Sequence, residues 1–223
     1  MPLYYEFKDN GVTSQPATIT GSYLNNFKNI WDLYINNSTI DPTTLTSEQN
    51  DAAAEFKAGK AVFYQNGTWE YSNVADVGDE NLGYLPIYVG VKDENQGLCC
   101  GTENYWAVNS EASKADQKAT LDFLKWVVTS EKGTTALAED MGFVSPFKKA
   151  KDVDNVLCNI MNQYVADGCY NVSWAFNYTP NVDTWRAGVV DAMAAYSAGT
   201  GEWDAVKTAF VDGWAEQYTL SKQ

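Results

Sequence analysis

The stretch Gly59–Val74 reads GKAVFYQNGTWEYSNV and places a tryptophan directly after a turn. The apolar run 61–64 predicts a short strand, and the Gln-Asn-Gly-Thr sequence after it predicts the turn. Trp69 and Glu70 follow at once. Because an indole is large, apolar and flat, a tryptophan there either covers a hydrophobic core or offers a surface on which a ligand can stack. The rest of the sequence has to distinguish these two roles.

Length and composition indicate a globular protein with one large or two small domains. The chain has 223 residues, of which 45% are hydrophobic, enough to form a sizeable core. No apolar run approaches the roughly 20 residues of a membrane helix, and the first residues show no signal-peptide pattern. The formal net charge of -14 argues against nucleic acid and anionic lipid as partners, since both require basic surfaces.

The sequence offers little catalytic or metal-binding equipment. It contains no histidine, which removes the commonest general base and transition-metal ligand. It has neither a Gly-x-Ser-x-Gly nucleophile motif nor a Gly-rich phosphate loop. The four cysteines lack zinc-site spacing, so we expect no metal and no cofactor. Cys158 and Cys169 form a disulfide if the protein is exported, or remain free thiols like Cys99 and Cys100.

An enzyme that hydrolyses glycosides with two carboxylates is the alternative to a binding protein. Glu70, Glu103, Asp183 and Glu202 lie near aromatic residues in the sequence. With 29 acidic residues in the chain, however, some neighbour a tryptophan by chance, and most Asp and Glu side chains simply face solvent.

The periodicity predicts many helices and a few strands, which is typical of α/β layers. Strand character is expected at 61–64 and in two runs within 81–109, separated by a polar turn. Ser22, Ser113 and Ser130 are predicted helix caps, and Thr46 with Gln49 resembles a capping box. The expected helices cover 21–36, 46–58, 114–128, 131–140, 152–166, 180–198 and 201–220.

Aromatic residues are abundant, with eight Trp and fourteen Tyr. A sugar ring stacks its C–H face on such a side chain, while Asn, Asp, Glu or Gln bonds its hydroxyls. Trp31, Trp126 and Trp214 follow helical apolar patterns and are expected in the core, whereas one of Tyr105 and Trp106 should face it. Three sets combine aromatic residues with polar neighbours: Asn66, Gly67, Trp69 and Glu70; Glu103, Asn104, Tyr105 and Trp106; and Asp183, Trp185 and Arg186.

The run AAEFKAGKAVFYQNGTWEYSNV resembles a segment of the extracellular solute-binding proteins of ABC importers, the sugar-binding family that includes maltose-binding protein. Four further motifs follow in the family's order: LGYLPIYVG, then CCGTENYWAVNSEASKADQKATLDFLKWVVTSEKG, then MGFVSPF, and finally PNVDTWRAGVVDAMAAYSAGT with the last helix. Together they extend across about residues 52–220.

The resemblance implies a periplasmic-binding-protein-like type II fold in which two lobes close on a sugar. Residues 1–82 and 143–223 would form the C-terminal lobe, and 83–142 would cross to the N-terminal lobe. Most of that N-terminal lobe has no counterpart here, so we expect a truncated form, with the missing lobe supplied by another chain or replaced by self-association.

The resemblance also assigns roles and partners. Trp69 and Trp185 fall on the family's stacking aromatics. Asn66, Glu70 and Asp183 are the expected hydroxyl partners, and Arg186 is expected to pair with Asp183. The implied ligand is a mono- or oligosaccharide, and the implied partner is a membrane permease. The full-length form would be an extracellular or periplasmic lipoprotein without enzymatic activity. The remaining alternative is an inert fragment whose tryptophans are buried.

Overall fold

The computed structural model describes residues 1–44, 51–91, 95–101 and 105–223. The chain divides into two compact units, each formed by segments far apart in the sequence. Unit 1 comprises Met1–Glu55, Pro86–Gly101 and Cys169–Gln223, and unit 2 comprises Phe56–Leu85 and Thr102–Gly168. Because these units reflect packing within this chain alone, the lobe boundaries at 82/83 and 142/143 stay a prediction.

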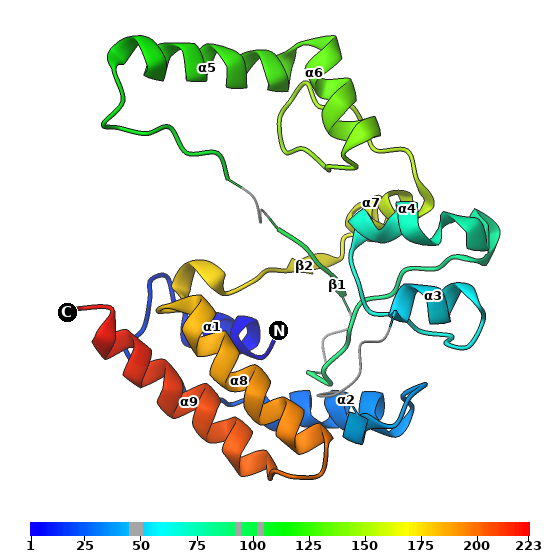
Figure 1. Cartoon of the computed structure of the whole chain (residues 1–223), viewed down its shortest axis with the longest axis vertical. Helices are drawn as coiled ribbons and strands as arrows, with labels where there is room; N and C mark the ends of the chain where they lie inside the picture. The colour runs from blue at the N-terminus through cyan, green and yellow to red at the C-terminus, as the bar shows by residue number, and fades with distance from the viewer. Residues whose placement is uncertain (45–50, 92–94, 102–104) are drawn as a thin grey trace. The chain divides into compact units, whose positions relative to one another are not determined.

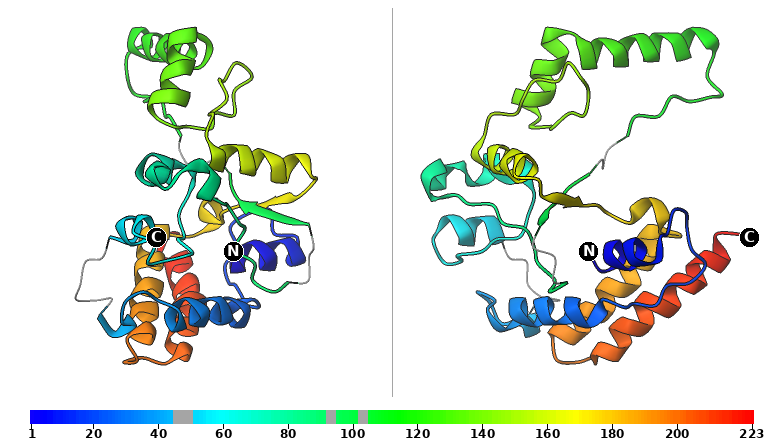
Figure 2. Two further views of the ribbon diagram at one scale, coloured as in Figure 1. Left: turned by 90° about the vertical axis from the view of Figure 1, so that its right-hand side faces the viewer. Right: turned by 180° about the vertical axis from the view of Figure 1, so that it is seen from behind.

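Unit 1 combines helices with a small parallel sheet. Its elements are α1 (Pro2–Asn10), α2 (Leu24–Asn36), η1 (Pro42–Thr44), β1 (Gln96–Cys99), β2 (Tyr170–Val172), η6 (Phe176–Tyr178), α8 (Val182–Ser197) and α9 (Trp203–Leu220). β1 and β2 run side by side in parallel, and α8 packs along α9 (Figures 1 and 2). The two closing helices are therefore confirmed, and Gly199, at φ 69°, follows the end of α8.

The largest hydrophobic cluster of unit 1 is built around Trp214 on α9. Its indole is fully buried and makes edge contacts with Phe7 and Trp185, and its Nε1–H donates to the carbonyl of Pro16 over 2.9 Å. A buried indole needs such an acceptor, because an unpaired polar group in a core is costly. The expectation that Trp214 lies in the core is confirmed.

The start of α2 differs from its predicted cap. Ser22 does not cap the helix, which begins after Tyr23. Instead, the buried carboxylate of Glu6 accepts the backbone N–H groups of Thr20, Gly21 and Ser22 at 2.5, 2.8 and 3.2 Å. A carboxylate accepts several hydrogen bonds at once, so Glu6 fixes this turn and leaves Ser22 no capping role.

Unit 2 is helical in the part that the structure describes. The boundary helix α3 (Ala52–Lys57) leads into it. The other elements are η2 (Thr68–Glu70), α4 (Tyr71–Val74), η3 (Ala75–Val77), η4 (Asp79–Asn81), α5 (Lys114–Thr129), α6 (Glu131–Thr135), the π-helical turn η5 (Ala136–Asp140) and α7 (Val156–Ala166). The proposed cap residues Thr46 and Gln49 lie outside the described residues.

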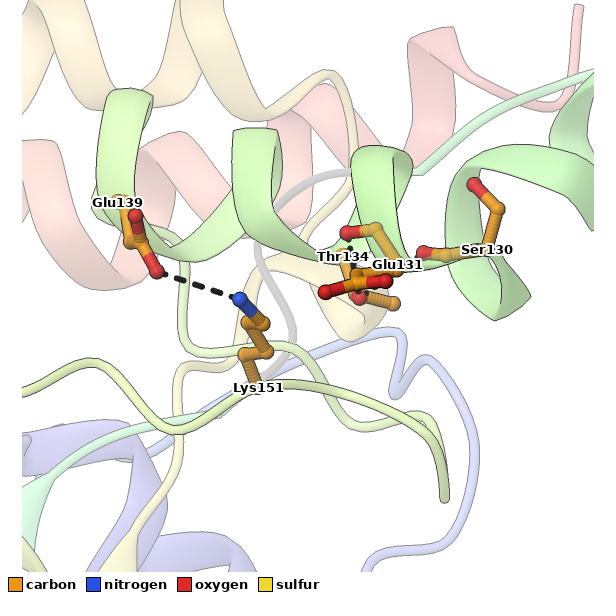
Figure 3. A network of polar contacts seen from close by, with 5 residues as sticks. All are labelled: Ser130, Glu131, Thr134, Glu139 and Lys151. Atoms are coloured by element: carbon orange, nitrogen blue, oxygen red, sulfur yellow. Dashed lines mark hydrogen bonds and ion pairs between the residues drawn. The ribbon is translucent and has the colours of Figure 1, made fainter.

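Two predicted caps are confirmed at the starts of α5 and α6. Ser113 Oγ accepts the N–H of Asp116 over 3.2 Å, and Ser130 Oγ accepts that of Gly133 over 3.0 Å. A Cβ on Gly133 would lie 2.3 Å from the carbonyl oxygen of Val127, so only glycine allows this close approach. Figure 3 shows the same region, in which Lys151 lies 3.4 Å from the Glu139 carboxylate and the Thr134 hydroxyl bonds the backbone of Ser130.

The predicted strand 61–64 is wrong, because these residues form no strand, Val62 lies in a bend, and no described strand pairs with them. A strand needs a neighbour to satisfy its backbone groups, and here Val62 and Phe63 remain about four-fifths exposed, at 82% and 79%. Among the described residues of 81–109, the only strand is β1, which overlaps the start of the second run. Its partner β2 was not predicted, because a strand of three residues is too short to show an alternation of apolar and polar side chains.

Several aromatics expected to be buried are exposed. Trp126 on α5 is 46% exposed, which contradicts the core assignment, because no described residue covers that apolar stripe of the helix. Tyr105 and Trp106 are both exposed, so strand alternation does not hold there. No helix among the described residues has the length and apolar character required to cross a membrane.

Candidate functional site

The six-membered ring of Trp69 lies close against Gly67. A Cβ built on Gly67 would lie 2.3 Å from both Cη2 and Cζ3 of the indole, well inside ordinary contact. The φ of Gly67 is -115°, a value that any residue adopts, so the requirement for glycine comes from the ring and not from the backbone. Trp69 is nevertheless 56% exposed. The side chain is therefore in close contact with Gly67 and still more than half exposed to solvent.

The polar neighbours of Trp69 are held in place by short-range bonds. Asn66 Nδ2 donates to the Tyr64 hydroxyl over 2.6 Å, and its Oδ1 accepts the N–H of Gly67 over 2.9 Å. Glu70 Oε1 accepts from Asn73 Nδ2 over 3.1 Å. Since a carboxylate offers about four acceptor positions, Glu70 retains capacity for a ligand hydroxyl.

The Trp69 turn is anchored to the first turn of α7. The side chain of Thr68 contacts the thiol of Cys158, which is 1% exposed and packs with Ala138 and Val153. Burial raises the pKa of this thiol, while hydrogen bonds from Asn155 and Thr68 act in the opposite direction. A buried, protonated thiol is chemically inert. Cys158 thus serves as a packing residue beneath the turn.

The four cysteines are free in this structure, and Cys158 and Cys169 are not joined. Of the two alternatives left open by the sequence, the structure therefore has free thiols. Cys100 is partly buried, which raises its pKa as well.

The Trp185 set lies in unit 1 and is engaged in packing. The indole of Trp185 makes edge contacts with Phe210 and Trp214, at centroid distances of 4.9 and 5.6 Å. Its Nε1–H donates to the carbonyl of Phe210 over 2.9 Å. These contacts are enough to explain a tryptophan at this position, and its stacking role stays a prediction.

Asp183 and Arg186 form the expected pair. Arg186 Nη2 lies 2.8 Å from Asp183 Oδ1, on the exposed surface of α8. An exposed pair at this spacing contributes little to stability. The pairing of Arg186 is confirmed, while ligand contacts by either residue stay predictions.

The third predicted set is only partly visible. Glu103 and Asn104 lie outside the described residues, and Tyr105 belongs to unit 2, where it is 65% exposed. The Trp69 set is therefore the one predicted cluster whose aromatic and polar members the structure brings together in an accessible position. Trp174, which no motif singled out, is a further aromatic packed close to a glycine, and it is partly buried.

The comparisons with known proteins agree with this reading of the chain. The sequence profile of the bacterial extracellular solute-binding proteins matches residues 4–161. The match includes the Trp69 set and Tyr105 but ends before Asp183, Trp185 and Arg186. No solved structure matches the chain. Since the profile match covers more than half of the sequence, the chain belongs to the bacterial extracellular solute-binding protein family, whose members are solute receptors of ABC importers.

Proposed function

We propose that this solute receptor binds a carbohydrate, most specifically an oligosaccharide. A ring of the sugar would stack on the indole of Trp69. The observation that carries the proposal is the indole supported on Gly67 yet 56% exposed. An exposed indole loses contact with water when a ligand covers it, and the C–H face of a sugar ring fits its flat apolar surface.

The polar side chains beside Trp69 suit the rim of a sugar. Asn66 and Glu70 offer amide and carboxylate groups within four residues of the indole, and their short-range bonds reduce the side-chain entropy lost on binding. The family is generally non-enzymatic, so no chemistry on the sugar is part of the proposal. A two-lobed type II arrangement, with ligand contacts from a second lobe, is proposed on the family resemblance alone.

Isothermal titration calorimetry tests the proposal with glucose, maltose, maltotriose, cellobiose and cellotriose. We expect saturable binding of at least one of these sugars and a loss of about tenfold or more in affinity for Trp69→Ala. Trp126→Ala is the matched control. Trp126 is also exposed, at 46%, but it lies on helix α5 and is not packed against a glycine.

Two results would contradict the proposal. The first is the absence of binding to every sugar of the panel by folded protein. The second is sugar binding that Trp69→Ala leaves intact, since the stacking surface would then lie elsewhere.

A further inference from the structure

A second indole lies on a glycine where the two strands of unit 1 end. Because β1 and β2 are parallel, their carboxyl ends lie at the same edge (Figure 1). The N–H of Cys100 donates to the carbonyl of Val172 over 2.9 Å and extends the pairing by one residue. Gly101 and Trp174 then follow, each two residues beyond its strand. In open α/β sheets, ligands bind at the carboxyl ends of the strands.

The packing of Trp174 resembles that of Trp69. A Cβ on Gly101 would lie 3.2 Å from both Cε3 and Cζ3 of Trp174, tighter than most contacts of real Cβ atoms, so the six-membered ring lies close against the glycine. The ring of Phe176 is parallel to the indole, with an interplanar angle of 4° and a centroid distance of 6.3 Å. Phe176 is 46% exposed. The two parallel rings form an apolar pair that remains partly open to solvent.

The indole N–H of Trp174 differs from those of three packed tryptophans, although the buried Nε1 of Trp203 is likewise without a partner among the described residues. Trp31, Trp185 and Trp214 each donate to a protein oxygen over 2.9 Å. For Trp174, the described part of the chain provides no acceptor. Its N–H is thus left for water or for a ligand hydroxyl.

The two segments that carry Trp174 and Gly101 contain no charged residue, which favours a neutral ligand. The chain has 15 basic and 29 acidic residues, yet the segment 169–182 has none, and neither does 95–101. The polar side chains next to Trp174 are the exposed hydroxyl of Ser173 and, three residues on, the exposed amide of Asn177. An anionic or cationic solute would lack a counter-charge from these segments, whereas sugar hydroxyls pair well with hydroxyl and amide groups.

We propose that Trp174, with Phe176 beside it and Gly101 beneath it, is a second ring-stacking subsite, which takes a ring of an uncharged sugar. This inference rests on the proposed function, since it names the class of sugar and a further contact for it. The subsite is formed by residues of unit 1 alone, and Trp174, like Trp185, is only partly buried.

Calorimetric titration of the full chain with the same neutral sugars, and with glucuronate as a charged analogue, tests the subsite. We expect Trp174→Ala to weaken binding of the best neutral sugar about tenfold, and Trp174→Phe to recover part of the loss. Gly101→Leu, which crowds the indole without removing it, should give a similar loss. Trp126→Ala is again the matched control, because Trp126 stacks on Phe123 at 6.0 Å without a glycine.

The outcomes separate the subsite from the proposed function. If Trp69→Ala loses affinity while folded Trp174→Ala and Gly101→Leu bind like the wild type, the subsite is wrong and the proposed function stands. Tighter binding of glucuronate than of glucose overturns the assignment of a neutral ligand. If the folded wild type binds no sugar at all, the proposed function fails, and this inference fails with it.

Discussion

Replacing Gly67 by alanine should displace the Trp69 indole while leaving the fold intact. The added Cβ would lie 2.3 Å from the ring, and ordinary contact begins at 3.4 Å, so the ring must move by about 1.1 Å (3.4 - 2.3). The backbone of Gly67 accepts alanine, and such a replacement restricts the unfolded chain, which stabilises by about 0.4–1 kcal/mol. Since Trp69 is more exposed than buried, we expect the free energy of unfolding to change by less than about 1 kcal/mol.

Ligand binding should respond more strongly than stability. An aromatic stack contributes up to about 1.5 kcal/mol beyond area burial, and a radial gap of up to 1 Å forfeits a quarter to a half of a dispersion contact. A loss of about 0.7 kcal/mol in binding free energy corresponds to about a threefold weaker Kd. Gly67→Ala should therefore bind sugar about threefold more weakly than the wild type, and Trp69→Ala more weakly still.

A double-mutant cycle identifies the cause. Urea denaturation measures stability, calorimetry measures Kd, and Trp emission reports the environment of the indole. In a Trp69→Ala background, Gly67→Ala should change neither Kd nor emission, because the ring on which it acts is gone. If Gly67→Ala leaves emission and Kd unchanged in the wild-type background, the indole does not lie on Gly67 and the reasoning fails. A change that persists without Trp69 would show that the backbone itself has moved.

Three further predictions concern stability and reactivity. Trp214→Ala should lower the free energy of unfolding by about 3–5 kcal/mol in urea titrations, because it empties the centre of the unit 1 core; a loss below 1 kcal/mol would contradict the burial. Hydrogen bonds from Lys28 and then Tyr196 lower the pKa of Asp32 below 3.8, so their contribution is fully present above that pH and is lost as pH falls through the lowered native pKa. Asp32→Asn should therefore be less stable than the wild type at neutral pH, by no more than about 1 kcal/mol, and the gap should close in acid; a gap independent of pH would argue against the pair. Cys158 should react with a thiol reagent only after unfolding, while labelling in the native state, read by mass spectrometry of peptides, would show that it is accessible.

Local rules in the sequence were enough to place several helix ends. Ser113 and Ser130 precede helical patterns, and each accepts a backbone N–H from the first turn of its helix. These signals need only neighbouring residues, so they can be read without knowing the fold. The pair α8 and α9 was predictable for the same reason, as Gly199 separates two long periodic segments.

The wrong predictions concern segments whose structure is determined by tertiary contacts. The apolar run 61–64 has strand composition, but a strand forms only beside a partner, and no described residue provides one. Trp126 follows a helical apolar pattern, which identifies one face of the helix without showing what covers it. The Ser22 cap was displaced by the carboxylate of Glu6, sixteen residues away, which no local pattern reveals.

A glycine in contact with a tryptophan helps to distinguish a candidate stacking residue from a core residue. In Trp214 and Trp185 the indole is packed against other rings and its N–H is bonded, so the side chain is already used by the fold. In Trp69 and Trp174 the six-membered ring lies close against a glycine, and the side chain is still partly exposed. Removing a Cβ lets the backbone support a ring without enclosing it, which keeps a flat apolar surface open at little structural cost. The Gly-Thr-Trp order at 67–69 makes the first of these arrangements readable in the sequence, whereas Gly101 and Trp174 lie 73 positions apart (174 - 101) and meet only because β1 and β2 run in parallel.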